Sequence, residues 1–346
     1  MDNLIMFVIV LLLAFVILYK IRISPFNEHF FDIDNSKAMR GFWCLIVILV
    51  HVPLQYGNVI QDMIGSFAYI GVSFFFLTSG YGLTLSQDKD YNRIKTFWRN
   101  RLPKLLIVNW LARIFFAILW LLIFNKNINF WEVISIDLWI SWLLACYFVF
   151  WLMSIVFHGK RGYKIATCVL IVWGSFVMFV LNKYGIISTT VWSTECIGFI
   201  WGIILASNRD RFVNYFSRKW ELKWGISAVV ALSLGGLYLM YKYVPYLGDY
   251  HLKIILGLAI LLFVLIANIR IEFGNILNHF LGTISLEIYI VHGFVFSTLE
   301  TLMEWKSSGM FIFCSIVLTI IVAWFIHLSS DLLLHKYKLL NKHKNM

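Results

Sequence analysis

Two histidines lie deep inside apolar segments of this sequence, where side chains that exchange protons are unusual. His51 ends the run KAMRGFWCLIVILVH at residues 37–51, and His292 ends LGTISLEIYIVH at 281–292. Arg40 precedes His51 by eleven residues, which on an α-helix is a rise of about 16 Å on nearly the same face. A titratable group at such a depth in a bilayer is costly and is a candidate for acid–base or transfer chemistry. The alternative is structural: a capping arginine and a histidine that hydrogen-bonds to a neighbouring helix.

A second group of polar residues shares one face of the later segment. Ser285, Tyr289 and His292 are spaced i, i+4 and i+7, which places them on the same side of a helix. Hydrogen bonds between helices, which membrane bundles commonly use, also explain the serine and the tyrosine. Near the end of the chain, His327 and Asp331 are i, i+4 neighbours, and we expect them to form a local pair at the membrane interface.

Two charged residues need a partner inside the apolar segments. Arg113 lies about 12 Å into the window 105–124 by helical rise, so its guanidinium must meet an anion, a carbonyl group or water. A structural pair with a carboxylate of a neighbouring helix and a direct role in substrate binding are equally open. For Glu287, the expected partners are Arg101, Lys104 and Arg113.

The composition indicates that membrane helices position these residues. Hydrophobic residues make up 61% of the 346 residues and charged residues only 14%, and the mean hydropathy is +0.81. A soluble domain contains fewer apolar and more charged residues, so the sequence predicts a polytopic integral membrane protein. The five cysteines are scattered and form no C-x-x-C pair, which favours buried thiols over a metal site or a disulfide framework.

Windows of roughly 17 to 25 mainly apolar residues mark the expected membrane spans. We expect an all-α bundle of about eleven transmembrane helices, with a short basic tail at 336–346. The windows are 4–20, 41–57, 67–85, 105–124, 136–157, 164–182, 192–206, 224–243, 252–269, 281–300 and 310–334.

Lysine and arginine residues gather in every second connection, beginning with the one at residues 20–40. Because connections rich in these residues stay in the cytoplasm, the pattern predicts that the N-terminus is outside and the C-terminus inside. Topology therefore accounts for the net charge of +11 without a nucleic-acid partner. A basic segment such as RIKTFWRNRLPK could also bind an anionic ligand at the inner surface.

Several stretches, taken in order, resemble the membrane acyltransferase-3 family. They are MRGFWCLIVILVH with its arginine and histidine, GVSFFFLTSGYGLT, the basic entry RNRLPKLL, SWLLACYFVFWL, and LGTISLEIYIVH with its Ser-x-x-x-Tyr-x-x-His pattern. The resemblance covers the chain from about residue 36 onward. It implies a ten-helix core that moves an acyl group, commonly acetyl, from cytoplasmic acyl-CoA to a hydroxyl group outside, usually of a glycan.

The resemblance implies that His51 is the essential histidine, acting as general base or acyl relay, and that Arg40 is its paired arginine. Arg101 and Lys104 match the second basic pair, but lysine replaces the usual second arginine and loses the planar fork that binds phosphate in a bidentate way. Glu287 stands where the family pattern has a small or apolar residue. The expected site has His51 and Arg40 in catalysis, Arg99, Arg101, Lys104 and Arg113 in acyl-CoA binding, and Ser79, Ser285, Glu287, Tyr289 and His292 in supporting roles, with no metal.

We therefore expect residues 1–35 to form an additional N-terminal helix and its connection, and residues 36–335 to form the acyltransferase domain. We expect the stand-alone form, without an extracellular esterase-like domain, in which the membrane core itself completes the transfer. The expected acceptor is a cell-envelope or capsular polysaccharide or its lipid-linked precursor, at a bacterial-type plasma membrane. A transporter or flippase for a polysaccharide unit or polar solute is the alternative, although the sequence has no convincing internal repeat.

Overall fold

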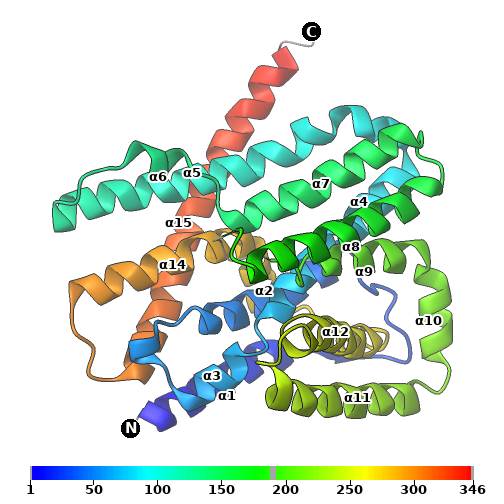
Figure 1. Ribbon diagram of the computed structural model, residues 1–346, viewed down its shortest axis with the longest axis horizontal. Coiled ribbons are helices and arrows are strands. Elements are labelled where there is room, and N and C mark those ends of the chain that lie inside the picture. The colour runs from blue at the N-terminus through cyan, green and yellow to red at the C-terminus, as the bar shows by residue number, and fades with distance from the viewer. Residues whose placement is uncertain (1, 188–191, 344–346) are drawn as a thin grey trace.

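The computed structural model describes residues 2–187 and 192–343 and is almost entirely helical (Figure 1). One small antiparallel sheet, β1 (Arg22–Ile23) with β2 (Ile271–Glu272), departs from the all-α expectation. The helices of the first half are α1 (Asp2–Leu18), α2 (Ile33–Val50), α3 (Val59–Gly65), α4 (Tyr69–Lys89), α5 (Phe97–Phe124), α6 (Phe130–Ile134), α7 (Leu138–Val156) and α8 (Gly162–Lys183). Those of the second half are α9 (Ile197–Ser207), α10 (Arg209–Ser217), α11 (Trp220–Tyr241), α12 (Lys253–Asn268), α13 (Ile276–Thr283), α14 (Ser285–Leu302) and α15 (Ser308–His343). Two short 3-10 helices, η1 (Leu54–Tyr56) and η2 (Tyr91–Thr96), and one π-helix, η3 (Leu247–Leu252), connect some of them.

Seven helical segments of the described chain are long and apolar enough to cross a membrane, and an eighth is added if the pair α13–α14, bent by 69°, is one span. They establish a multi-pass membrane protein, while the count of eleven spans and the orientation of the termini stay predictions. The helix at window 192–206 has only 11 residues, about 16 Å, which is short of a hydrocarbon core about 30 Å thick. The seven are Val59–Lys89, Tyr91–Phe124, Leu138–Val156, Gly162–Lys183, Trp220–Tyr241, Leu247–Asn268 and Ser308–Tyr337.

The window predicted at 41–57 is not one helix. Helix α2 begins earlier, where the side chain of Asp32 caps it by accepting a hydrogen bond from the backbone of Asn35, and His51 caps its other end. Proline lacks the amide hydrogen that a helix needs and disfavours helical geometry in the residue before it, so Pro53 explains why the helix stops here. His51 therefore lies at a helix terminus, where the chain turns, rather than in the middle of a continuous helix.

Helix α4 runs through the interior and is packed closely against α9. A Cβ atom on Gly198 would lie 2.1 Å from the carbonyl oxygen of Ser73, and one on Gly202 would lie 2.1 Å from that of Leu77. Small residues four apart let two helix backbones approach in this way, which is a common means of packing in membranes. The contact holds α4, which carries Ser79, in a fixed position.

A similar contact joins α2 to α13. A Cβ atom on Gly41 would lie 2.3 Å from the carbonyl oxygen of Asn278, and one on Gly282 would lie 1.9 Å from that of Lys37. Only glycine allows the two backbones to approach so closely. The contact places the charged start of α2 beside the start of α14.

Helix α1 is attached to the bundle by buried asparagines. The side-chain amide of Asn275 donates to the carbonyl oxygens of Val16 at 2.9 Å and Tyr19 at 2.8 Å, and that of Asn278 donates to Val16 at 2.8 Å. These bonds satisfy carbonyl groups at the end of α1 that have no partner within the helix. The N-terminal helix is thus packed into the molecule next to α13.

Candidate active site

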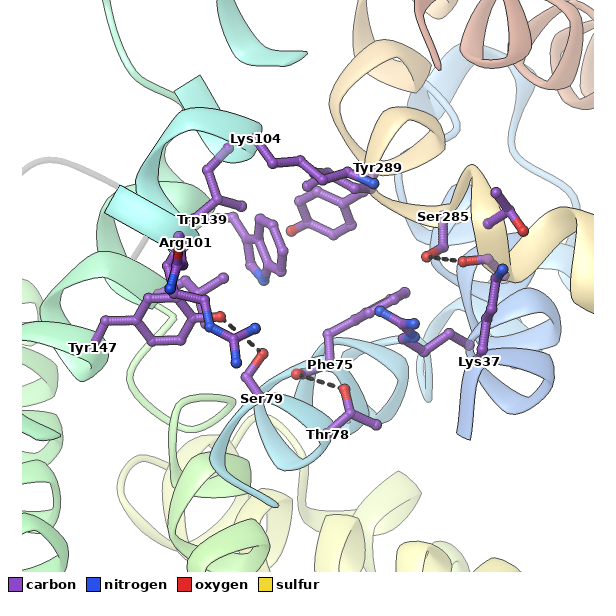
Figure 2. Close-up of a pocket in the computed structure, with 17 residues that line it drawn as sticks. Lys37, Phe75, Thr78, Ser79, Arg101, Lys104, Trp139, Tyr147, Ser285 and Tyr289 are labelled. Atoms are coloured by element: carbon purple, nitrogen blue, oxygen red, sulfur yellow. Dashed lines mark hydrogen bonds between the residues drawn. The ribbon is translucent and has the colours of Figure 1, made fainter. Parts of the chain in front are cut away.

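Six helices meet around a cavity of about 400 Å³ (Figure 2). Lys37 and Arg40 come from α2, and Arg101 and Lys104 from one face of α5. The close-up shows Lys37 on the opposite side of the cavity from Arg101 and Lys104. The other lining residues are Phe75, Thr78, Ser79, Asn100, Leu105, Trp139, Leu143, Tyr147, Gly282, Thr283, Ser285, Leu286 and Tyr289.

The cavity carries uncompensated positive charge. Its lining includes four cationic side chains and no aspartate or glutamate. None of the four makes an ion pair with a described residue, and the Nε atom of Arg40 is buried without a hydrogen-bond partner in the described chain. Lysine and arginine side chains arranged in this way suit an anionic ligand such as phosphate.

Two hydrogen-bond donors lie side by side in the wall of the cavity. The rings of Trp139 and Tyr289 have centroids 4.5 Å apart. The indole nitrogen of Trp139 and the hydroxyl of Tyr289 are both buried and have no partner among the described residues. Buried donors are normally satisfied, so these two are available to an acceptor atom of a ligand in the cavity. Nearby, the hydroxyl of Tyr147 donates to that of Ser79 at 3.4 Å.

The two histidines predicted from the sequence lie together beside this wall. The ring of Tyr289 lies 5.7 Å from that of His292, whose centroid lies 4.7 Å from the ring of His51. The Nδ1 atom of His292 lies 3.2 Å from the carbonyl oxygen of Ile288. A carbonyl can only accept, so Nδ1 carries the hydrogen, and Nε2 is left as the acceptor in the neutral ring.

The structure places most of the predicted site residues at the first cavity or directly beside it. Arg40, Ser79, Arg101, Lys104, Ser285 and Tyr289 line the cavity, and His51 and His292 form the adjacent pair. Arg99 is exposed and is not among the lining residues. The hydroxyl of Ser285 donates to the carbonyl of Gly282 at 3.0 Å, a local bond from the start of α14 to the last turn of α13.

The expected pairing of Glu287 with Arg101, Lys104 or Arg113 is wrong. Its fully buried carboxylate lies 2.9 Å from Nδ1 of His327 on α15. The Nε2 atom of the same histidine lies 3.2 Å from Asp331, which confirms the predicted local pair. Glu287, His327 and Asp331 therefore form a connected series, in which the histidine joins the buried carboxylate of Glu287 to the exposed carboxylate of Asp331.

Arg113 lies at a second cavity and has a backbone partner. Its guanidinium donates to the carbonyl oxygen of Glu132 at 2.8 Å and to the side chain of Asn109 at 3.4 Å. It also lies over the ring of Phe294, 5.8 Å from the centroid. The sequence left open whether Arg113 meets an anion, a carbonyl group or water, and the structure provides a carbonyl group. Arg113 lines the second cavity and not the first.

The predicted site did not include Lys37, Trp139 and Tyr147, which line the first cavity. Lys37 lies three residues before Arg40, the helical spacing that puts two side chains on one face, so this spacing could have revealed it. Tyr147 lies in the stretch SWLLACYFVFWL of the family resemblance, and Trp139 precedes that stretch by two residues. Only the packing of α7 shows that they line the cavity, where Trp139 meets Tyr289 of α14 and Tyr147 meets Ser79 of α4. Within the described ranges, no group of three or more His, Cys, Asp or Glu side chains is placed to hold a metal ion.

A family model described as an acyltransferase domain, acyltransferase-3, matches residues 31–328. The comparisons with curated proteins and with solved structures give no match. The family match covers nearly the whole chain and includes every element that lines the cavity. The protein therefore belongs to the acyltransferase-3 family and is a membrane acyltransferase.

Proposed function

We propose that the protein is an O-acyltransferase that moves an acetyl group from acetyl-CoA to a hydroxyl group of a cell-envelope or capsular polysaccharide, or of its lipid-linked precursor, at a bacterial plasma membrane. The observation that carries the proposal is the group of four cations without acidic partners around one cavity, beside two histidines in contact. The family match supports the reaction class.

The phosphate groups of CoA bind among the four cations. Arg101 and Arg40 offer planar guanidinium groups that can bind two phosphate oxygens at once, whereas Lys104 and Lys37 act as point charges. Because the cavity has no acidic lining residue, phosphate binding replaces repulsion among the cations with attraction. This arrangement favours CoA over an uncharged thioester.

The thioester end of the donor lies at the part of the wall formed by Trp139 and Tyr289. Their unpartnered donors hydrogen-bond to the thioester carbonyl oxygen and stabilise the negative charge that develops there during attack. The ring of Tyr289 also connects this wall to His292 and, through it, to His51.

His51 is the general base or the acyl relay. As a base, its imidazole takes the proton of the acceptor hydroxyl while the oxygen bonds to the thioester carbon and the C–S bond breaks, and the proton then passes to the CoA thiolate. As a relay, an imidazole nitrogen bonds to the thioester carbon while the C–S bond breaks and CoA thiolate leaves. The acceptor hydroxyl then attacks the acyl-imidazole, which forms the ester and regenerates His51, and the hydroxyl proton passes to the thiolate. In both cases His292, fixed by its bond to the Ile288 carbonyl, orients the His51 ring.

The reaction takes place across the membrane. The cations of the cavity lie at the cytoplasmic end, where acyl-CoA is present, and the acceptor approaches from the outer side. The distribution of lysine and arginine over the connections supports this orientation, with the N-terminus outside and the C-terminus inside.

Mass spectrometry of envelope glycans, in strains with and without the gene, tests the proposal. We expect an acetyl-sized mass difference on one glycan, which is lost in His51→Ala and Arg40→Ala variants and kept in Arg99→Ala, a matched control outside the cavity. Immunoblots confirm that each variant reaches the membrane at the level of the wild type. Identical glycans in all strains would refute the proposed acceptor class.

A further inference from the structure

A second cavity, of about 280 Å³, lies between α5, α14 and the segment 125–133. Arg113, Trp120 and Phe294 contribute to its wall from the two helices, and Lys126 and Glu132 contribute from the segment between α5 and α7. The proposed donor site uses none of these residues.

The two cations of this cavity form no ion pair with a described acidic side chain, although Glu132 is part of the same wall. The guanidinium of Arg113 is fixed by the carbonyl of Glu132, and the ammonium of Lys126 lies 4.6 Å from the centre of the Trp120 ring. Neither makes an ion pair with a described residue. The Glu132 carboxylate instead accepts a bond from Asn129 at 3.2 Å. Because an arginine inside an apolar helix is costly without a counter-charge, Arg113 together with the exposed Lys126 at the same cavity favours an anionic ligand.

Both cavities lie along the same two helices, on either side of the histidine pair. On α5, Lys104 lines the first cavity and Arg113 the second, nine residues or about 14 Å apart by helical rise. On α14, Tyr289 lines the first and Phe294 the second, and His292 lies between them in the sequence.

Aromatic contacts hold these two helices together at the second cavity. The rings of Phe116 and Phe294 stack with centroids 5.0 Å apart, and the indole of Trp120 donates to the hydroxyl of Thr298 at 2.8 Å. The positions of Arg113 and Trp120 relative to α14 are therefore fixed, which a binding site needs.

We infer that the second cavity is the acceptor subsite and binds an anionic group of the acceptor, either a sugar carboxylate or the phosphate of a lipid-linked glycan. Arg113 and Lys126 hold the anion, and the aromatic side chains contact the adjoining sugar or lipid. This inference rests on the proposed function, since it assigns the acceptor to the cavity that the donor does not occupy.

Equilibrium binding to the full-length protein, in nanodiscs of phosphatidylcholine, tests the inference with three probes. They are a glucuronate-containing disaccharide, its neutral glucose counterpart and a short-chain isoprenyl phosphate. We expect at least one anionic probe to bind about 10-fold or more tightly than the neutral one, consistent with a charge-assisted contact. Preference for the glucuronate identifies a sugar carboxylate, and preference for the isoprenyl phosphate identifies a lipid-linked acceptor.

The variants Arg113→Gln and Lys126→Gln should each weaken anion binding by about 10-fold or more. Lys306→Gln, which removes an exposed cation outside this cavity, should leave binding unchanged. Lys126 is in a connecting segment, so its variant remains informative if Arg113→Gln does not fold. Equal binding of all three probes, or an equal loss in Lys306→Gln, would overturn the inference.

Acetyl-CoA binding in the same samples separates the two proposals. We expect Arg113→Gln and Lys126→Gln to bind acetyl-CoA as the wild type does, because neither residue lines the donor cavity. A wild type that binds the anionic probe through Arg113 and Lys126 but not acetyl-CoA would refute the proposed donor and leave the anion site in place.

Discussion

At the scale of single residues, the main feature is charge that the protein leaves uncompensated. Four cations surround the donor cavity without an acidic neighbour in its lining, whereas the buried carboxylate of Glu287 has its own partner in His327. Like charges held close together disfavour the unliganded state, so a ligand that binds only the folded protein should stabilise it.

The sequence predicted some of these residues and not others, for physical reasons. Arg40 and Tyr289 could be predicted because a family pattern identifies them in their own segments. The partner of Glu287 could not be predicted, because His327 is forty residues further along, on the next helix, and the apolar sequences of α14 and α15 do not determine how the two helices pack. His51 and His292 were expected at one depth, and their ring contact depends on the turn that follows α2.

The pair of Glu287 and His327 should contribute strongly to stability. His327→Ala leaves a fully buried carboxylate without its partner, and such a loss costs about 3–5 kcal/mol. Asp331→Asn is the matched control: this carboxylate is 57% exposed, and removing an exposed ion pair costs about 1 kcal/mol or less. Denaturant unfolding of the purified protein measures both. Equal stability of the two variants would show that the buried pair is not needed for folding.

At the scale of helices, close contacts between glycines and backbone carbonyls position the site. The apolar windows predicted most helices well, because long hydrophobic runs with few charges have only one stable conformation in a membrane. They failed where helix ends depend on local chemistry. Pro53 ends α2 before the predicted boundary. Helix α9 is shorter than the predicted window 192–206 because residues 193–196 of that window form a turn before the helix begins.

Gly282→Ala tests the contact between α2 and α13. A Cβ atom there would lie 1.9 Å from the carbonyl oxygen of Lys37, so the two helices must separate, at a cost of about 1–3 kcal/mol. We expect lower thermal stability and weaker acetyl-CoA binding, because Lys37 and Arg40 move away from Arg101.

The control for this variant is Gly225→Ala on α11, where a Cβ atom would meet no neighbouring atom within 4 Å. In a helix, alanine is more favourable than glycine, so the control should be as stable as the wild type or slightly more so. If Gly282→Ala behaves in the same way as Gly225→Ala, the two helices do not need their close contact.

At the scale of the whole molecule, the two cavities require a defined orientation in the membrane. The proposed donor and acceptor sites lie along the same pair of helices, α5 and α14, so the direction of α5 decides which cavity faces the cytoplasm. Lysine and arginine residues near the start of α5 and apolar residues near its end predict that it runs from inside to outside.

Cysteine labelling measures this orientation. In a protein whose Cys168 and Cys314 are replaced by alanine, Glu304→Cys should react with a membrane-impermeant maleimide in intact cells. Asn92→Cys should react only after permeabilisation. Both positions are exposed in the structure, so a lack of access reflects the membrane. The opposite pattern would place the cationic cavity outside and contradict the proposed use of cytoplasmic acyl-CoA.

The most direct test of the donor site compares the binding of acetyl-CoA and acetyl-pantetheine, which lacks the nucleotide phosphates. Since charged hydrogen bonds contribute about 1.5–3 kcal/mol each, wild-type protein should bind acetyl-CoA about 100-fold or more tightly. The double variant Arg101→Gln/Lys104→Gln should lose most of that preference but bind acetyl-pantetheine as the wild type does. An Arg99→Gln control, outside the cavity, should keep the wild-type preference for acetyl-CoA. Equal binding of the two thioesters by the wild type, or an unchanged preference in the double variant, would contradict the account.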